Sequence, residues 1–234
     1  MRSCRQRSVV GHRPHETGAQ PPVVRVVDDD PALLRAVALL LRAAGLGVET
    51  FDSAEAFLAR RGDAPGCAVL DLHMGGPGGL ELQEALAQTD DPLPVIFLTG
   101  RGDVQSSVRA MKGGAVDFLT KPASGDELVE AVRRAVAIDA AARADRRRLR
   151  ELRAKYQTLT PREREVFALV VRGLPNRQIA GELGTSERTV KAHRANVMQK
   201  MAMESVAGLA RAAERLGEPT MRPSGRRGGI RDGG

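Results

Sequence analysis

Between residues 23 and 138, short apolar runs alternate with longer stretches in which apolar side chains recur every three or four positions. The runs, of four or five residues each, are Val23–Val27, Gly47–Phe51, Cys67–Leu70, Pro94–Leu98 and Val116–Leu119. Such runs predict strands that are buried on both faces of a sheet. The stretches around them predict helices over Pro31–Ala44, Ala54–Arg60, Gly79–Gln88, Val104–Met111 and Ser124–Ala137. Five strand–helix units in succession predict an α/β fold, a five-stranded parallel, doubly wound sheet with helices on both faces.

The pattern becomes entirely helical from residue 159 onward. Thr160 and Glu163 flank Pro161 in the arrangement of a capping box, which marks the start of a helix. Four helices are predicted, over about 161–172, 177–183, 187–201 and 204–216, with Asn176 and Ser186 as the caps of the second and third. Two short helices joined by a tight glycine-containing turn are typical of a helix-turn-helix domain, so an all-α four-helix domain follows the sheet domain.

The remaining segments complete the expected organisation. Residues 1–22 and 218–234 are rich in Arg, Gly, Pro and Ser without periodicity, and we expect disordered tails there. Residues 139–158 are rich in Ala, Arg and Leu, which favour a helical linker. The sheet domain is therefore expected at 23–138 and the helix-turn-helix domain at 159–217.

Charge divides the chain at the same place. Residues 23–139 carry 11 basic and 18 acidic side chains, a net charge of −7. Residues 140–217 carry 17 basic and 8 acidic side chains, a net charge of +9. An acidic half and a basic half indicate two domains with different partners, and the basic half is the candidate for binding a polyanion.

Composition argues against several other classes of protein. Cys4 and Cys67 are the only cysteines in the sequence, too few for a disulfide framework or a cysteine metal cluster. No apolar stretch approaches the roughly 18–20 residues of a membrane span. The basic N-terminal segment lacks the apolar centre of a secretory signal. We therefore expect a cytoplasmic protein with no membrane partner.

Polar side chains follow the predicted strands at their carboxyl ends. They are Asp28, Asp29 and Asp30 after the first strand, Asp71 after the third, Thr99 after the fourth and Lys121 after the fifth. In an open parallel sheet these ends meet at one edge, where function collects. Crowded carboxylates suit a hard cation such as Mg²⁺, and a carboxylate that attacks phosphorus forms an acyl phosphate, whose charge an ammonium and a hydroxyl stabilise. The pattern indicates phosphoryl transfer to an aspartate.

This set resembles the receiver domain of two-component response regulators, over essentially all of residues 23–138. The spacings agree, with 42 residues from Asp29 to Asp71, 28 from Asp71 to Thr99 and 22 from Thr99 to Lys121. The pair Lys121-Pro122 resembles the family's Lys-Pro pair, whose peptide bond is usually cis, and residues 99–104 are close to the FixJ-like branch. The resemblance implies a flavodoxin-like fold for this domain.

The resemblance also implies a role for each side chain at this edge. Asp71 would accept the phosphoryl group, and Thr99 and Lys121 would hold it. Phe118 occupies the position of the family's aromatic switch residue. Mg²⁺ is the implied cofactor, and its implied ligands are Asp28, Asp29, Asp71 and the backbone carbonyl of His73. Asp30 is assigned to the cap of the first helix instead.

Residues 159–217 resemble the LuxR-type helix-turn-helix domain. The matching stretches are L-T-P-R-E-R-E-V at 159–166, N-R-Q-I-A at 176–180 and S-E-R-T-V-K-A-H-R at 186–194. Helical periodicity places Val190, Val197 and Met201 on the buried stripe of the third helix. The opposite face would enter the major groove of DNA. The expected DNA contacts are Arg177 from the preceding helix and Arg188, Lys191, Ala192, Ala195, Asn196 and Gln199.

Both motifs on one chain indicate a two-component response regulator of the FixJ/NarL-like type, a phosphoryl-accepting transcription regulator and not an enzyme. A sensor histidine kinase would donate the phosphoryl group to Asp71. Phosphorylation would favour a homodimer, whose paired domains would bind double-stranded promoter DNA. RNA polymerase is a further partner that this role allows.

Three other interpretations stay open on the residues alone. An aspartate-based phosphatase would release phosphate from small phosphomonoesters, although no second acid–base group is placed for turnover. A sigma-factor-like module, which residues 159–171 resemble loosely, would bind core polymerase without a promoter-specific footprint. A phosphorylation-independent helix-turn-helix regulator is disfavoured because no group required for phosphorylation is missing.

Overall fold

The computed structural model describes residues 20–100 and 104–218. It divides into two compact units, Met1–Ala142 and Arg143–Gly234, which we describe in turn. The two tails expected from the sequence lie outside the described residues, apart from residues 20–22 and 218. Among the described residues, no helix combines the length and the apolar character needed to cross a bilayer.

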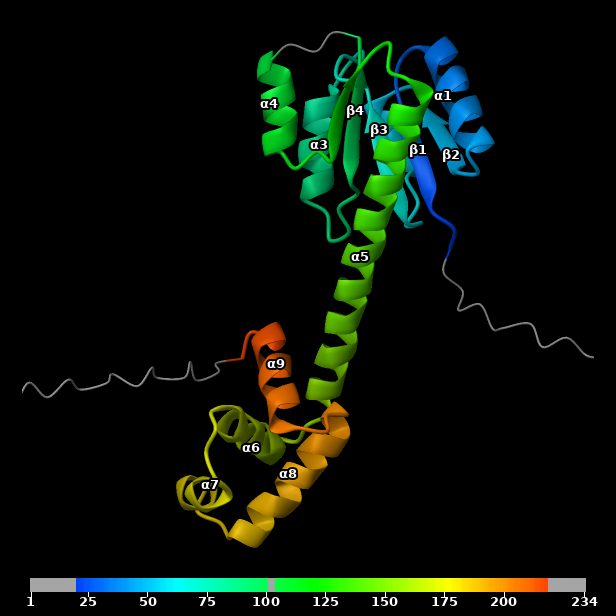
Figure 1. Cartoon of the computed structure of the whole chain (residues 1–234). Coiled ribbons are helices and arrows are strands. Elements are labelled where there is room, and N and C mark those ends of the chain that lie inside the picture. Colours follow the sequence, from blue (N-terminus) through cyan, green and yellow to red (C-terminus); the bar gives the residue numbers. More distant parts are fainter. Residues whose placement is uncertain (1–19, 101–103, 219–234) are drawn as a thin grey trace, which may run out of the picture. The chain divides into compact units, whose positions relative to one another are not determined.

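The first unit is built around a parallel sheet (Figure 1). Its strands are β1 (Val23–Val27), β2 (Gly47–Phe51), β3 (Gly66–Leu70), β4 (Val95–Thr99) and β5 (Asp117–Thr120). Their order across the sheet is β2-β1-β3-β4-β5. The predicted five-stranded parallel sheet is therefore confirmed, with strand bounds that differ from the prediction by at most one residue.

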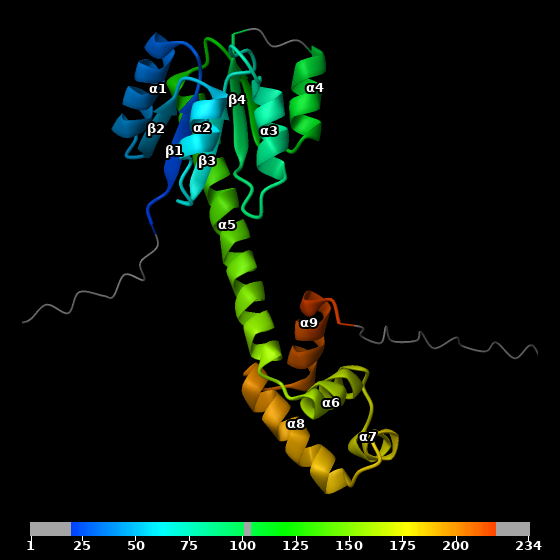
Figure 2. The same cartoon turned by 180° about the vertical axis from the view of Figure 1, so that it is seen from behind.

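Helices cover both faces of this sheet (Figures 1 and 2). One face carries α1 (Pro31–Ala43) and α5 (Gly125–Gln157), and the other carries α2 (Ala54–Arg60), α3 (Gly79–Ala87) and α4 (Val104–Lys112). Two side chains cap helices of this unit: Asp30 Oδ1, as predicted, accepts from the amides of Ala32 and Leu33, and Ser53 Oγ accepts from the amide of Ala56. Each cap satisfies amides that the first helical turn leaves unpaired.

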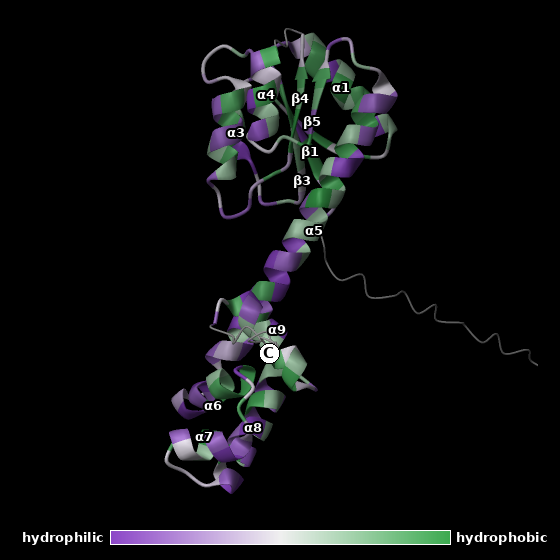
Figure 3. Cartoon of the chain, turned by 60° about the vertical axis from the view of Figure 1, so that its left-hand side comes forward, coloured by the Kyte–Doolittle hydropathy of each residue, from purple (hydrophilic) through white to green (hydrophobic). Residues whose placement is uncertain are grey.

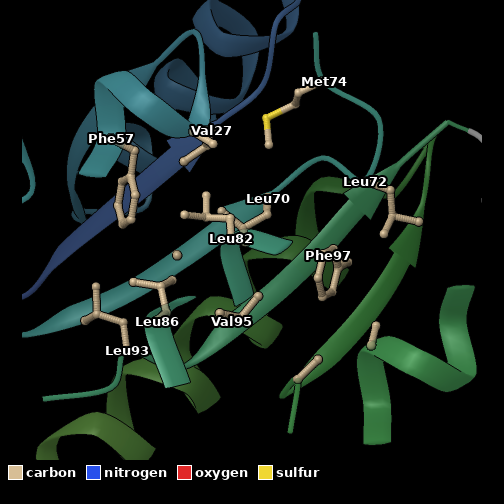
Figure 4. Close-up of a cluster of buried hydrophobic side chains, with 14 of the residues drawn as sticks. Val27, Phe57, Leu70, Leu72, Met74, Leu82, Leu86, Leu93, Val95 and Phe97 are labelled. Atoms are coloured by element: carbon tan, nitrogen blue, oxygen red, sulfur yellow. The ribbon is translucent and has the colours of Figure 1, made fainter. Parts of the chain in front are cut away.

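Alternating side chains of the central strands contribute to two separate hydrophobic cores, one on each face of the sheet. On one face, Phe57 of α2 and Leu82 and Leu86 of α3 pack with Leu70 and Phe97 of the sheet (Figure 4). On the other face, side chains of α1 and α5 pack against Val24, Val26, Cys67, Val69, Ile96 and Leu98. Each fully buried Leu or Phe stabilises the fold by about 2 kcal/mol. The central strands are correspondingly hydrophobic along most of their length. The helices around them carry both hydrophobic and hydrophilic residues (Figure 3).

The prediction that all five strands are buried on both faces was wrong for β2 and β5. Each has one strand neighbour only, because β2 and β5 form the two edges of the sheet. Most of β2 is exposed or half-buried, and no residue of β5 is fully buried. Edge strands shield less of their own surface, and run length alone does not distinguish an edge strand from a central one.

The helix α5 continues without interruption to Gln157, so the stretch from residue 139 is helical to that point. Within the first unit its apolar side chains Leu128, Ala131, Val132 and Ala135 are buried. Asp139 is also fully buried, and its Oδ2 accepts a hydrogen bond of 2.8 Å from the amide of Gly66. A side chain at Gly66 would collide with the backbone of Val23, which explains why glycine begins β3.

The second unit is helical, with α6 (Pro161–Val171), α7 (Asn176–Glu182), α8 (Glu187–Met201) and α9 (Val206–Leu216). The capping box of Thr160 and Glu163 is present. The core gathers Phe167 and Val170 from α6, Ile179 from α7, Val190, Val197 and Met201 from α8 and Leu209 from α9. The buried stripe predicted for α8 is therefore confirmed.

The prediction that Asn176 caps α7 was wrong. Pro175 is the cap residue of α7 and makes no side-chain cap, so Asn176 lies inside the first turn. The Oδ1 of Asn176 instead accepts a hydrogen bond of 3.0 Å from Arg194 of α8. The side chain of Asn176 thus bonds to a residue of another helix, Arg194, instead of to the first amides of α7.

Candidate functional site

The carboxyl ends of four strands meet at one edge of the first unit. Backbone hydrogen bonds continue the sheet up to this edge, from the amide of Asp28 to Phe51 O (3.1 Å), of Asp71 to Val27 O (3.0 Å) and of Lys121 to Thr99 O (2.8 Å). The sheet itself therefore fixes the backbone from which each of these polar side chains projects. The residues at the predicted strand ends therefore do lie at one edge, with Asp71, Thr99 and Lys121 around a common cleft.

Lys121 lies between two buried carboxylates. Its Nζ is 2.6 Å from Asp28 Oδ2 and 3.1 Å from Asp71 Oδ1, and both aspartate side chains are less than a tenth exposed. Burial lowers the pKa of Lys121, but the hydrogen bonds to Asp28 and Asp71 and their charges outweigh it, so the pKa is raised. The ammonium therefore remains charged at neutral pH, and one positive charge faces two negative ones.

The other oxygen of Asp71 accepts a hydrogen bond of 2.7 Å from the amide of His73. Asp71, His73, Thr99, Gly100 and Lys121 together line a cleft of about 340 Å³. The Asp71 carboxylate is thus held at both oxygens, yet it borders a space into which a small group fits. The side chain of Thr99 is buried at the end of β4, on the wall of the same cleft.

The three consecutive aspartates after β1 have different surroundings. Asp28 is buried, and its Oδ1 accepts from the amide of Asp30 at 2.9 Å. Asp29 is exposed, and its Oδ2 accepts from the amide of Gly75 at 3.2 Å. Asp30 caps α1, as predicted. Burial therefore separates the aspartate that pairs with Lys121 from its two neighbours.

The carboxylates at this edge are candidate ligands for a metal ion. Among the described residues, no three Asp, Glu, His or Cys side chains gather closely enough to hold a metal ion. Asp28 and Asp71 nevertheless converge on a single cation, the Lys121 ammonium. Such a two-carboxylate set suits Mg²⁺, which proteins often hold through one or two carboxylates together with water and phosphate oxygens.

Phe118 lies on β5, half-buried, with its ring centroid 6.0 Å from that of the buried Phe97. The ring of Phe118 therefore packs against Phe97 on one side and is partly exposed on the other. The Lys121–Pro122 peptide bond is cis, as the family resemblance implied. Phe118 thus lies three residues before Lys121, and the cis bond lies directly after it.

Sequence reasoning missed an apolar groove beside this site. The groove has a volume of about 530 Å³ and is lined by α1 residues Leu33, Ala36, Val37 and Leu40 and by Leu98, Lys121, Pro122, Ala123, Ser124, Gly125 and Leu128. No local pattern announces it, because its two walls are almost a hundred residues apart in the chain. The groove places an apolar surface next to Lys121.

The second unit presents a polar face on α8. Ser186 caps this helix by accepting from the amide of Thr189 at 3.2 Å. All seven residues predicted to contact DNA are exposed: Arg177, Arg188, Lys191, Ala192, Ala195, Asn196 and Gln199. The hydrogen bond between Arg194 and Asn176 joins α8 to α7 and holds the two helices of the motif together. Sequence reasoning had left Arg194 without a definite role.

Comparisons with known proteins agree with this division. The model of the response regulator receiver domain matches residues 24–133, and the model of the luxR family of bacterial regulatory proteins matches residues 157–213. The response regulator protein TmoT of Ectopseudomonas mendocina is 43% identical over 198 residues, which are 84% of this chain and 90% of TmoT. The transcriptional regulatory protein FixJ of Rhizobium meliloti is 44% identical over 191 residues, 81% of this chain and 94% of FixJ.

Solved structures point the same way. A low-resolution structure of the response regulator StyR superposes with a TM-score of 0.74 at 46% identity, covering 83% of this chain and 99% of StyR. A crystal structure of full-length FixJ from B. japonicum gives a TM-score of 0.52 at 40% identity, covering 85% of this chain and 98% of FixJ. These similarities extend over both units.

Proposed function

The chain belongs to the response regulators that join a receiver domain to a LuxR-type DNA-binding domain, a class of phosphorylation-regulated transcription regulators, and we propose that Asp71 is its phosphoacceptor. The observation that carries this assignment is the unbalanced charge at the strand ends, where the single ammonium of Lys121 faces the carboxylates of Asp28 and Asp71. Of these two carboxylates, only Asp71 lines the cleft. It is therefore the one that an incoming phosphoryl group reaches.

The proposed donor is the phosphohistidine of a sensor histidine kinase. An oxygen of Asp71 attacks the phosphorus, the new O–P bond forms an acyl phosphate as the N–P bond breaks, and the leaving imidazole nitrogen takes up a proton from solvent. Lys121 stays charged and stabilises the transferred oxygens, with Thr99 as a hydroxyl donor from the wall of the cleft. The apolar groove between α1 and the start of α5, which adjoins Lys121, is the proposed docking surface for the kinase.

Mg²⁺ is the proposed cofactor, held by Asp28, Asp29 and Asp71 with the backbone carbonyl of His73. When bound, it supplies positive charge that neutralises the phosphoryl oxygens. Asp29 accepts a hydrogen bond from Gly75 on Oδ2, and a carboxylate that accepts one amide keeps other lone pairs for a cation. Asp28 and Asp71 already converge on one cation, the ammonium of Lys121, which supports their part.

The proposed output is a homodimer formed through α4 and β5. Val104, Val108 and Met111 recur at helical spacing on α4, and all three are exposed. Phe118 lies on β5, a strand that α4 contacts, and Thr99 lies on the wall of the cleft at Asp71, which supports their roles as switch residues. Exposed apolar side chains on one stripe favour association.

Two copies would then bind paired half-sites in double-stranded promoter DNA. The exposed face of α8, with Arg188, Lys191, Asn196 and Gln199, offers donors for phosphates and base edges. The net charge of +9 over residues 140–217 favours a polyanion. RNA polymerase is the partner through which a bound dimer would alter transcription.

Light scattering with Mg²⁺, in the presence and absence of acetyl phosphate, tests the proposal on the full chain and on Asp71→Asn. The wild type is expected to gain a phosphoryl group and to double its mass, and the variant to do neither. Phosphorylation without a gain in mass would support Asp71 as the phosphoacceptor and would contradict the proposed homodimer. Equal behaviour of the two proteins would reject the phosphoacceptor, and steady release of phosphate from phosphomonoesters would favour the phosphatase instead.

A further inference from the structure

A glutamine is buried between α3 and α4, two helices that lie side by side on one face of the sheet (Figure 2). Gln83 of α3 is only 5% exposed, although glutamine side chains mostly remain in water. Its Nε2 donates a hydrogen bond of 3.0 Å to the carbonyl oxygen of Ala110 in α4. Burial of an amide is costly unless the amide is hydrogen-bonded, so this contact compensates for the desolvation of Gln83.

The helix α4 is otherwise weakly buried. Of its nine residues, all of them described, Ala110 alone is classed as buried. The ion pair between Arg109 and Glu84 of α3 spans 3.7 Å and is exposed, so it contributes little. The attachment of α4 to α3 is therefore strongest near its C-terminal end, where Gln83 meets Ala110.

The turn after α4 leaves room for the amide of Gln83. The carbonyl of Ala110 also accepts from the amide of Ala115 at 3.1 Å, so it has two donors. A Cβ at Gly113 would lie 2.8 Å from Oε1 and 3.0 Å from Cδ of Gln83. The absence of a side chain at Gly113 thus allows the amide of Gln83 to lie against the backbone. Helix α3 supplies the amide, and the turn after α4 supplies the space.

We propose that Gln83 is a positioning residue of the phosphorylation switch, which holds the C-terminal end of α4 against α3 so that α4 moves about this end. The opposite end of α4 follows β4, whose last residue, Thr99, lines the cleft at Asp71. One end of the helix is therefore joined to the site, and the other is anchored. The movement of α4 rests on the proposed function, whereas the anchoring contact does not.

Hydrogen exchange on the unphosphorylated full chain tests the anchor. Gln83→Met keeps the length of the side chain and removes the donor. The amides of residues 113–115, which bond back to the last turn of α4, are expected to exchange about fivefold faster, the effect of losing one net hydrogen bond. Gln88→Met, at an exposed position that ends α3, is the matched control and is expected to change nothing there. Unaltered exchange in Gln83→Met would overturn the anchor.

A second variant approaches the same contact from α4. Gly113→Ala places a methyl group against the amide of Gln83 and is expected to accelerate exchange to a similar degree. In a Gln83→Ala background, where the amide is gone, the same change is expected to add nothing. Additive effects of the two substitutions would show that they act separately, and would overturn the contact as their common cause.

The positioning role is tested by the ratio of dimer dissociation constants with and without acetyl phosphate. Gln83→Met is expected to reduce the phosphorylation-induced tightening about fivefold while the rate of Asp71 phosphorylation stays unchanged. A wild-type ratio in this variant would overturn the role in positioning. If the wild type itself does not tighten, the dimer of the proposed function fails, and the exchange data still decide on the anchor.

Discussion

Two lysines, one in each unit, make ion pairs of equal length in opposite electrostatic situations. Lys121 lies 2.6 Å from Asp28 and 3.1 Å from Asp71, so a single positive charge faces two buried carboxylates. Lys200 lies 2.6 Å from Glu163, whose carboxylate also accepts from the amide of Thr160 in the capping box. The first group carries excess negative charge, and the second is balanced.

Charge balance, rather than distance, therefore distinguishes the group that we propose as the functional site from a structural ion pair. An unbalanced buried group attracts a further cation and retains a reactive carboxylate. The balanced group joins α6 to α8, because Lys200 of α8 donates to Glu163 of α6. The two situations therefore respond differently when one partner is removed.

The largest expected effect is that of Lys121→Met. The substitution leaves two buried carboxylates facing each other, and we expect it to lower the free energy of unfolding of the first unit by about 3 kcal/mol, part of which Mg²⁺ restores. Native-state hydrogen exchange in β3, with and without Mg²⁺, measures both changes. Lys112→Met removes an exposed lysine and serves as the control. If Lys121→Met lowered the free energy of unfolding no more than this control, the excess of negative charge around Lys121 would be contradicted.

Glu163→Gln is expected to have the next largest effect, about 2 kcal/mol in the second unit. Burial raises the pKa of Glu163, but the hydrogen bonds from Lys200 and Thr160 lower this pKa by a larger amount, so the net shift is downward. A carboxylate whose pKa is lowered by folding stabilises the fold above its ordinary pKa of 4.5 and loses that contribution as the pH falls through the folded value. Urea unfolding of the second unit across acidic pH measures this dependence.

In that titration the wild type is expected to lose stability below about pH 4.5, and Glu163→Gln is expected to lack this component. Glu214→Gln, at an exposed position on α9, is the control and should follow the wild type. Parallel curves for the wild type and Glu163→Gln would show that the capping-box carboxylate does not govern the acid response.

Lys200→Met is expected to cost less than Glu163→Gln, about 1 kcal/mol, because Glu163 keeps its bonds with Thr160 and because Lys200 is about a third exposed. The order is thus the reverse of that in the first unit, where loss of the lysine is the more damaging change. Urea unfolding at low and high salt checks this, since added salt should weaken the wild-type advantage. Equal costs for the two partners would remove the contrast between the units.

The smallest expected change in stability is that of Asp71→Asn, within about 1 kcal/mol of the wild type. The variant weakens the bond to the amide of His73 but relieves repulsion with Asp28. Thermal unfolding with Mg²⁺ omitted measures the balance. A large loss of stability would mean that Asp71 contributes to the fold as Glu163 does, and would weaken its assignment as a reactive group.

Much of the fold was predictable because the strands and helices have different hydrophobic periods. The predicted bounds of β1 and β2 equal the observed ones, and an aspartate directly follows each of these two runs. The candidate site was predictable for a geometric reason, because parallel strands bring their carboxyl ends to one edge. The list of polar side chains at that edge therefore followed from strand assignment alone.

Other features depended on contacts that no local pattern records. The exposure of β2 and β5 follows from strand order, and the capture of Asn176 by Arg194 follows from the packing of α7 against α8. Likewise, the sequence of α3 does not reveal that Gln83 is buried, since its partner lies in α4. Each of these is decided by a neighbour that is distant in the chain.

The backbone bonds that end the sheet have a consequence for how the site tolerates change. The amides of Asp28, Asp71 and Lys121 all donate to a neighbouring strand, so the positions of these three residues are set by main-chain atoms that no substitution other than proline removes. A new side chain placed there inherits the same location and direction. The edge of this sheet is thus a scaffold on which reactivity can be redesigned one residue at a time, with the architecture beneath it left in place.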